Sequence, residues 1–133
     1  MTSRILNIAL WIAQVLLSAV FLMAGYMKLS ASMEELHAQM DWPGDLPEPL
    51  VRFIGLSEFI GAVGLLAPAL TKIKTALTPW AASGLALVML MAAIFHLMRG
   101  EYSAILVNSG FGLLSAFVAW GRFRKVRLEE KQV

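Results

Sequence analysis

Four apolar runs, each about as long as a membrane is thick, constrain this chain more than any other feature. They lie at about residues 5–27, 50–68, 79–98 and 103–121. A helix crosses the hydrocarbon core of a bilayer in about 20 residues, and there every backbone polar group has to be hydrogen-bonded within the protein. The sequence therefore predicts an all-α membrane protein, a single bundle of four transmembrane helices.

The composition agrees with lipid as the main surroundings of the chain. Of its 133 residues, 59% are hydrophobic and 15% are charged, whereas soluble domains carry about 25% charged residues. The first run is 23 residues long, which exceeds the roughly 7–15 residues of a signal-peptide core. We therefore expect it to be retained as a membrane helix.

Several classes of function are not expected from this composition. The chain has no cysteine, so it can form neither a disulfide nor a dithiol redox pair. Its two histidines, His37 and His96, are not spaced as metal ligands, and no metal site is expected. The net charge is only +2, and no basic patch is interleaved with aromatic residues, so we expect no nucleic-acid partner.

The basic residues predict how the bundle is oriented, because positive charge is enriched on the cytoplasmic side. The first connection is acidic, and Lys28 is its basic residue; its acids are Glu34, Glu35, Asp41, Asp45 and Glu48. The basic groups lie at the other end of the spans: Arg4, Lys72, Lys74, Arg122, Arg124, Lys125, Arg127 and Lys131. Both termini should face the cytoplasm, with residues 122–133 as a basic, solvated tail that meets anionic lipid.

Two local patterns predict where helices begin. Ser32 and Glu35 have the S-x-x-E form of a capping box, and the residues after Ser32 alternate apolar and polar at helical spacing. We expect a short amphipathic helix in the first outer loop, or else a surface loop with some helix. Thr78 is the expected N-cap of the third span, and Pro79 its first helical residue.

Polar residues gather in the outer half of the predicted bundle. Counting about 1.5 Å per residue, Glu58 lies about 12 Å deep, Asn108 about 10 Å and His96 about 6 Å, and Lys28 ends the first span on the same side. The expected rim of this site is formed by Arg52, Arg99 and Glu101. The cytoplasmic half offers no comparable set. The pattern predicts a binding site in the outer half, with no catalytic residue assigned.

Each of these four residues also has a structural interpretation. A carboxylate in hydrocarbon is costly, so Glu58 should be protonated, in contact with water, or paired with Lys28 or His96. Such a pair could serve only to fix the register of the helices. Lys28 could extend to the interface, Asn108 could hydrogen-bond another helix, and His96 could be satisfied at its helix end.

Three segments resemble the DoxX-like family of small four-helix membrane proteins. They are GYMKL at 25–29, GLSEFIGAVGLLAP at 55–68 and MLMAAIFHLMRGE at 89–101, and the resemblance covers about residues 15–121. It implies a four-helix bundle in a cytoplasmic or organellar membrane, and the expected location is a bacterial cytoplasmic (inner) membrane. The polar positions of the family fall on Lys28, Glu58 and His96. Some members of the family are associated with thiosulfate:quinone oxidoreduction or with quinone-related stress, and a eukaryotic relative assists the assembly of receptors. The resemblance therefore implies a function of one of these kinds.

Several functions are compatible with these features. The first is binding of a small lipophilic molecule, quinone-like or lipid-like, by Glu58, Lys28, His96 and Asn108. The second is a membrane subunit of a quinone-linked oxidoreductase, in which Glu58 or His96 passes protons and a partner or a bound cofactor carries electrons. The third is an assembly factor that contacts other membrane helices. A proton-coupled transporter comes last, because four spans would require a dimer. The expected partners are membrane lipids, with a homo-oligomer or another membrane protein as possibilities.

Overall fold

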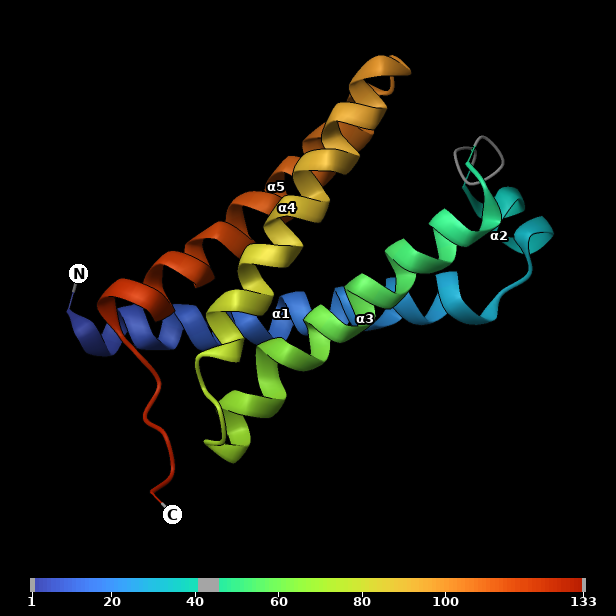
Figure 1. The fold of residues 1–133 in the computed structure, drawn as a ribbon. Coiled ribbons are helices and arrows are strands. Elements are labelled where there is room, and N and C mark those ends of the chain that lie inside the picture. The colour runs from blue at the N-terminus through green and yellow to red at the C-terminus, as the bar shows by residue number, and fades with distance from the viewer. Residues whose placement is uncertain (1, 41–45, 133) are drawn as a thin grey trace.

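Most of the described residues are helical. The structure, a computed structural model, describes residues 2–40 and 46–132. Figure 1 shows the order of its elements, which are α1 (Ser3–Ser30), α2 (Met33–Gln39), α3 (Glu48–Thr71), α4 (Leu77–Met98), α5 (Tyr102–Trp120) and a short π-helix at Gly121–Lys125. Asp41 and Asp45 of the acidic first connection lie outside the described residues.

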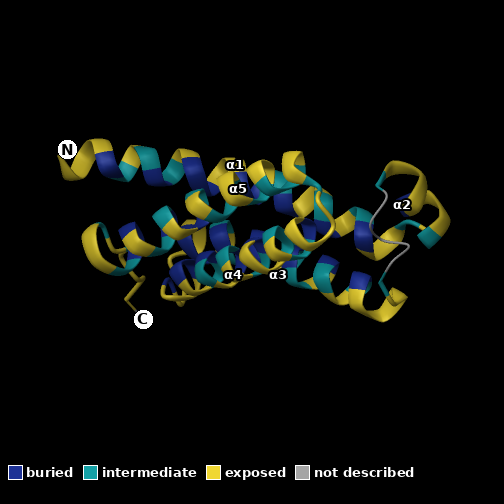
Figure 2. Cartoon of the chain, turned by 90° about the horizontal axis from the view of Figure 1, so that it is seen from above, coloured by how far each residue is buried: buried dark blue, intermediate teal, exposed yellow. Residues whose placement is uncertain are grey.

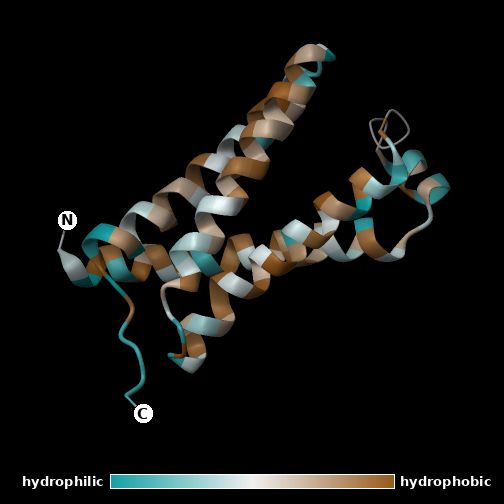
Figure 3. Cartoon of the chain, in the orientation of Figure 1, coloured by the Kyte–Doolittle hydropathy of each residue, from teal (hydrophilic) through white to brown (hydrophobic). Residues whose placement is uncertain are grey.

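Four of these helices are long and apolar enough to cross a membrane: α1, α3, α4 and the continuous helix at 102–125. Their apolar residues occupy most of each helix, while hydrophilic residues gather at the ends and in the C-terminal tail (Figure 3). The prediction of four transmembrane helices is confirmed, and each helix extends a few residues beyond its apolar run at one end or both.

Large apolar side chains cover the outside of the bundle. Ile12, Leu106 and Leu113 are 64%, 76% and 73% exposed, and buried positions form narrow stripes along the helices (Figure 2). A water-soluble protein rarely exposes apolar surface on this scale. This outer surface is suited to contact with lipid chains.

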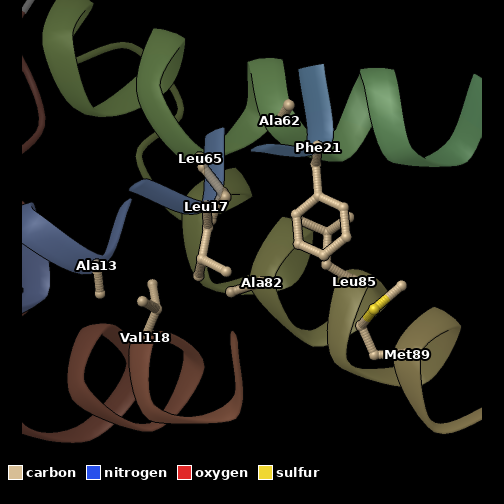
Figure 4. Packing of buried hydrophobic residues seen from close by; sticks show 9 residues of the cluster. All are labelled: Ala13, Leu17, Phe21, Ala62, Leu65, Ala82, Leu85, Met89 and Val118. Atoms are coloured by element: carbon tan, nitrogen blue, oxygen red, sulfur yellow. The ribbon is translucent and has the colours of Figure 1, made fainter. Parts of the chain in front are cut away.

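The helices form two hairpins that cross. Helices α1 and α3 pack along each other, as do α4 and α5, and the two pairs diverge toward one end of the molecule (Figure 1). We call this end, where α2 lies, the α2 end, and we call the opposite end, where both termini lie, the termini end. The hydrophobic core occupies the crossing and includes Leu17, Phe21, Leu65, Leu85 and Val118 (Figure 4).

Hydroxyl and amide side chains connect the helices within the spans. Ser18 Oγ of α1 donates to the carbonyl of Ala62 at 2.8 Å. Thr78 was predicted to be the N-cap of the third span, and this is wrong: α4 begins at Leu77, and Thr78 Oγ1 donates to the carbonyl of Gly64 at 3.0 Å. The hydroxyl is turned toward α3, because in lipid such a side chain gains most from a carbonyl on a neighbouring helix.

Helix α2 is the short amphipathic helix expected in the first connection. Both hydrogen bonds of its capping box are present: Glu35 N donates to Ser32 Oγ, and Ser32 N donates to the Glu35 carboxylate. Leu36 is fully buried, whereas Glu34 and His37 are exposed. The helix therefore lies with its apolar face on the protein.

Candidate ligand-binding site

Lys28 and Glu58 form a buried ion pair between the two helices of the first hairpin. Lys28 Nζ donates to Glu58 Oε2 at 2.8 Å. The two residues are only 6% and 3% exposed. Of the alternatives for Glu58, the structure shows the pair with Lys28. The positive charge of Lys28 compensates the negative charge of Glu58. This lowers the free-energy cost of placing Glu58 in a membrane span.

Two glycines bring the partners of this pair together. A Cβ atom on Gly25 would lie 2.6 Å from the carbonyl oxygen of Gly55 and 2.7 Å from the backbone nitrogen of Phe59, and one on Gly55 would lie 2.6 Å from the Lys28 Cβ. Glycine therefore allows α1 and α3 to approach backbone to backbone one turn away from the ion pair. The side chains of Lys28 and Glu58 meet because the helices are this close.

Arg52 holds the end of α1. Its Nη1 donates to the carbonyls of Lys28 at 2.7 Å and Ala31 at 2.5 Å, and its Nη2 donates to Glu48 Oε1 at 3.0 Å. The last carbonyls of a helix have no partner within the helix and carry partial negative charge. Arg52 therefore acts as a C-terminal cap across the hairpin, a role that differs from the site rim expected for it.

On the second hairpin, His96 pairs with Glu101. His96 Nδ1 lies 3.1 Å from Glu101 Oε1, and Arg99 Nε donates to the same oxygen at 2.5 Å. The hydrogen bond from Arg99, followed by that from His96, lowers the pKa of Glu101 below its ordinary value. This cluster joins the end of α4 to the start of α5. It agrees with the interpretation of His96 as a residue satisfied at its helix end.

A cavity of about 380 Å³ lies between the two hairpins and contains all four predicted site residues in its walls. Its polar lining residues are Lys28, Ser57, Glu58, His96 and Asn108, and the rest are apolar: Met40, Leu46, Leu50, Phe53, Ile54, Val88, Met89, Met91, Ala92 and Phe95. The three residues expected at the rim, Arg52, Arg99 and Glu101, do not line it. The residues expected from depth alone thus converge from four helices.

Asn108 differs from the other polar residues of the cavity. It is half-buried, and within residues 2–40 and 46–132 its amide makes no hydrogen bond to protein. The interpretation of Asn108 as a hydrogen-bonding link between helices is therefore not what the structure shows. An amide carries donors and acceptors, so Asn108 can recognise a carbonyl or hydroxyl group that enters the cavity.

The lining of the cavity is suited to recognising a small molecule by shape and hydrogen bonding. Pockets for small molecules are mostly apolar, with a few polar groups that fix orientation, and measure about 300–1,000 Å³. This cavity has that character and lies at the small end of the range. No group of three or more possible metal ligands occurs among the described residues.

A second polar set lies at the termini end, where the sequence suggested none. Arg122 is only 3% exposed, and its Nε and Nη1 donate to Gln14 Oε1 and Asn7 Oδ1, each at 2.7 Å. The expectation that Arg122 belongs to a solvated tail is wrong, because the helical chain continues through 121–125 and turns this side chain inward. Asn7 and Gln14 lie seven residues apart, on one face of α1, and this spacing within an apolar run was the missed signal.

A sequence model described as the DoxX-like family matches residues 12–118, which include the ion pair, His96 and Asn108. No individual curated protein and no solved structure matches the chain.

Proposed function

The chain belongs to the DoxX-like family, and from that premise we propose that it binds a small lipophilic molecule in the cavity between its two hairpins. The observation that carries the proposal is the Asn108 amide, which has no hydrogen bond to described residues and stands in the wall of an apolar cavity. A polar group in such a place is costly unless it is hydrogen-bonded. A ligand with one hydrogen-bonding end supplies that partner.

The charges of the cavity favour a neutral ligand. Lys28 and Glu58 already compensate each other at 2.8 Å, and His96 is placed beside Glu101. A charged ligand would add an uncompensated charge to an apolar site, which costs far more than a neutral carbonyl or hydroxyl does. Asn108 and the ion pair therefore suit the polar ring of a quinone-like molecule better than an anionic lipid headgroup.

The size of the cavity sets what part of the ligand is enclosed. About 380 Å³ accommodates a ring and a short part of a chain, so a longer isoprenoid or acyl tail has to leave between the hairpins. The helices there expose apolar side chains, including Phe53 and Met91 of the cavity wall. The ligand would thus have its ring in the protein and its tail in lipid.

Native mass spectrometry of the whole chain in mild detergent tests this proposal. The probe is a short-chain benzoquinone, and an alkylbenzene of similar size is the control compound. We expect the wild type and Ser109→Ala to bind the quinone alike, because Ser109 is exposed and does not line the cavity. Asn108→Ala should bind about five- to tenfold more weakly, the effect of one lost hydrogen bond of about 1 kcal/mol.

Two results would count against the proposal. One is a wild-type chain that binds neither the added quinone nor a lipophilic molecule from its own membrane. The other is equal occupancy in wild type, Asn108→Ala and Glu58→Gln, which would place any bound molecule elsewhere on the chain.

A further inference from the structure

Arg122 brings a guanidinium group into the termini end of the bundle without a carboxylate partner. Its hydrogen-bond acceptors are the amide oxygens of Asn7 and Gln14 and the carbonyl of Val126, at 2.7, 2.7 and 3.1 Å. The guanidinium also lies 5.5 Å from the ring of Trp11. Over the part of the chain that the structure describes, no acid lies within ion-pair distance of it. Among the described residues, the groups that contact this positive charge are neutral dipoles and one aromatic ring.

One nitrogen of this guanidinium has no partner at all. Arg122 Nη2 is buried and is the one buried side-chain nitrogen or oxygen, among the described residues, that makes no hydrogen bond. Leaving a charged donor buried and unsatisfied costs more than leaving a neutral one. Among the described residues, Arg122 therefore lacks one hydrogen-bond acceptor and a compensating negative charge.

A cavity of about 270 Å³ adjoins Arg122 at this place. Its walls are Thr75, Ala76, Pro79, Arg122, Phe123, Arg127 and Leu128, so two arginines and no acid face it. The C-terminal tail closes one side, since Thr75 Oγ1 donates to the carbonyl of Leu128 at 3.3 Å and Lys131 N donates to that of Lys72 at 2.6 Å. The cavity is therefore enclosed in part by the C-terminal tail and by the connection between α3 and α4, which are hydrogen-bonded to each other.

The surroundings add positive charge. Lys72, Lys74, Arg124 and Lys125 are exposed on the same connection and tail, and the acids Glu129 and Glu130 are exposed beyond the cavity walls. Arginine has a planar fork of donors that matches phosphate oxygens. Because the site lies where the spans end, it is at the depth of lipid phosphates if the bundle crosses a bilayer along its spans.

We propose that this cavity binds an anionic phosphate group, held between Arg122 on its buried wall and Arg127 on its exposed wall. The phosphate belongs either to an anionic lipid headgroup or to free phosphate. The charge of the phosphate would compensate the guanidinium of Arg122 in the buried wall, and the exposed guanidinium of Arg127 would donate hydrogen bonds to the phosphate oxygens. The site is separate from the cavity between the hairpins and takes a ligand of opposite character.

The test compares two exposed arginines near the end of α5; Arg127 also donates from Nε to the carbonyl of Phe123 at 2.9 Å, which leaves its other guanidinium nitrogens for a ligand. Arg127 lines the cavity and Arg124 does not, although both are exposed and both lie on the tail side of α5. Native mass spectrometry of the full chain would measure the affinity for dioleoyl phosphatidylglycerol, for dioleoylglycerol and for inorganic phosphate. Because Arg127→Gln and Arg124→Gln remove the same charge, a general surface attraction would weaken equally in both.

We expect phosphatidylglycerol, but not dioleoylglycerol, to bind the wild type. Arg127→Gln should lower that affinity about tenfold, as expected for one hydrogen bond to a charged group, and Arg124→Gln should change it less than about twofold. Arg122→Lys keeps the positive charge but loses the planar set of guanidinium donors, so it should also weaken binding. If inorganic phosphate binds with the same dependence on Arg127 and phosphatidylglycerol does not, the source is free phosphate.

The proposal is overturned if neither phosphate compound binds, or if Arg124→Gln and Arg127→Gln lose affinity equally. Arg122 would then be a structural arginine that ties the end of α5 to α1. Since Arg127 is exposed, its replacement should leave the fold intact, and the test does not depend on whether Arg122→Lys folds.

Discussion

At the scale of single residues, the buried ion pair links stability to the ligand site. Lys28 and Glu58 stand in the wall of the cavity and also hold α1 and α3 together. Removing one partner of a buried pair leaves an uncompensated charge, whereas removing both can be nearly neutral. The two roles can therefore be separated by experiment.

Lys28→Met alone should destabilise the bundle by about 3–5 kcal/mol, because it leaves the Glu58 carboxylate without its cation. The double variant Lys28→Met with Glu58→Met should recover much of that loss. Unfolding in mixed detergent micelles, followed by circular dichroism, measures both. If Lys28→Met is as stable as the wild type, the pair does not contribute as its burial implies.

Glu101 should make stability depend on pH in the acid range. Its pKa in the folded protein is lowered by Arg99 and then by His96, so the folded state binds its proton less readily than the unfolded state does. Its contribution is therefore fully present above the ordinary pKa of about 4.5 and is lost as pH falls through the lower, folded value.

The check is the difference in melting temperature between wild type and Glu101→Gln. We expect the wild type to be the more stable at pH 7 and the difference to shrink as pH is taken well below 4.5. A difference that stays constant from pH 7 to pH 3 would contradict the assignment, since glutamine does not titrate.

At the scale of elements, the sequence predicted the helices well and their contacts in part. The four spans follow from apolar length, and α2 follows from its capping box, since both signals are local. Depth along each span placed Lys28, Glu58, His96 and Asn108 at one cavity. The sequence offered Lys28 as one of several partners for Glu58, but it could not select among them, because the choice depends on how the helices rotate and cross.

Two of the wrong predictions, those for Thr78 and Arg122, have the same physical origin. Thr78 and Arg122 were assigned by rules for helix starts and charged tails, but each side chain turns to a partner on another helix. In lipid, a hydroxyl or guanidinium finds few partners other than protein groups. Contacts between helices therefore prevail over local preference at such positions.

The close approach of α1 and α3 gives a prediction at this scale. Gly25→Ala should destabilise the hairpin by about 1–3 kcal/mol, because its Cβ would lie 2.6 Å from the backbone oxygen of Gly55, which cannot move as a side chain would. Gly110→Ala is the matched control: its Cβ would meet nothing within 4 Å. The control should be neutral or slightly stabilising, since alanine favours helix. Equal effects in thermal unfolding would contradict this account.

At the scale of the whole molecule, the chain is an integral membrane protein, and its orientation can be tested directly. The wild type has no cysteine, so a single introduced thiol gives an unambiguous signal. Glu34 and Lys131 are both exposed, one in α2 and the other in the tail. They lie at the opposite ends of the bundle.

The distribution of basic residues predicts which end faces out. In intact cells stripped of any outer barrier, a membrane-impermeant maleimide should label Glu34→Cys and should label Lys131→Cys only after the membrane is opened. The reverse pattern would place the termini outside and would assign the phosphate site to the other leaflet. Labelling of both before opening would mean mixed orientations.

The divergence of the two hairpins gives the molecule a tapered profile (Figure 1). Helices that cross near the termini end and separate toward the α2 end occupy unequal areas in the two leaflets of a bilayer. A tapered inclusion is best accommodated where the membrane bends so that the leaflet holding its wider end has the larger area. We therefore expect the chain to become enriched where its membrane is strongly bent, and fluorescence microscopy of a tagged chain in tubulated and flat membranes would test this.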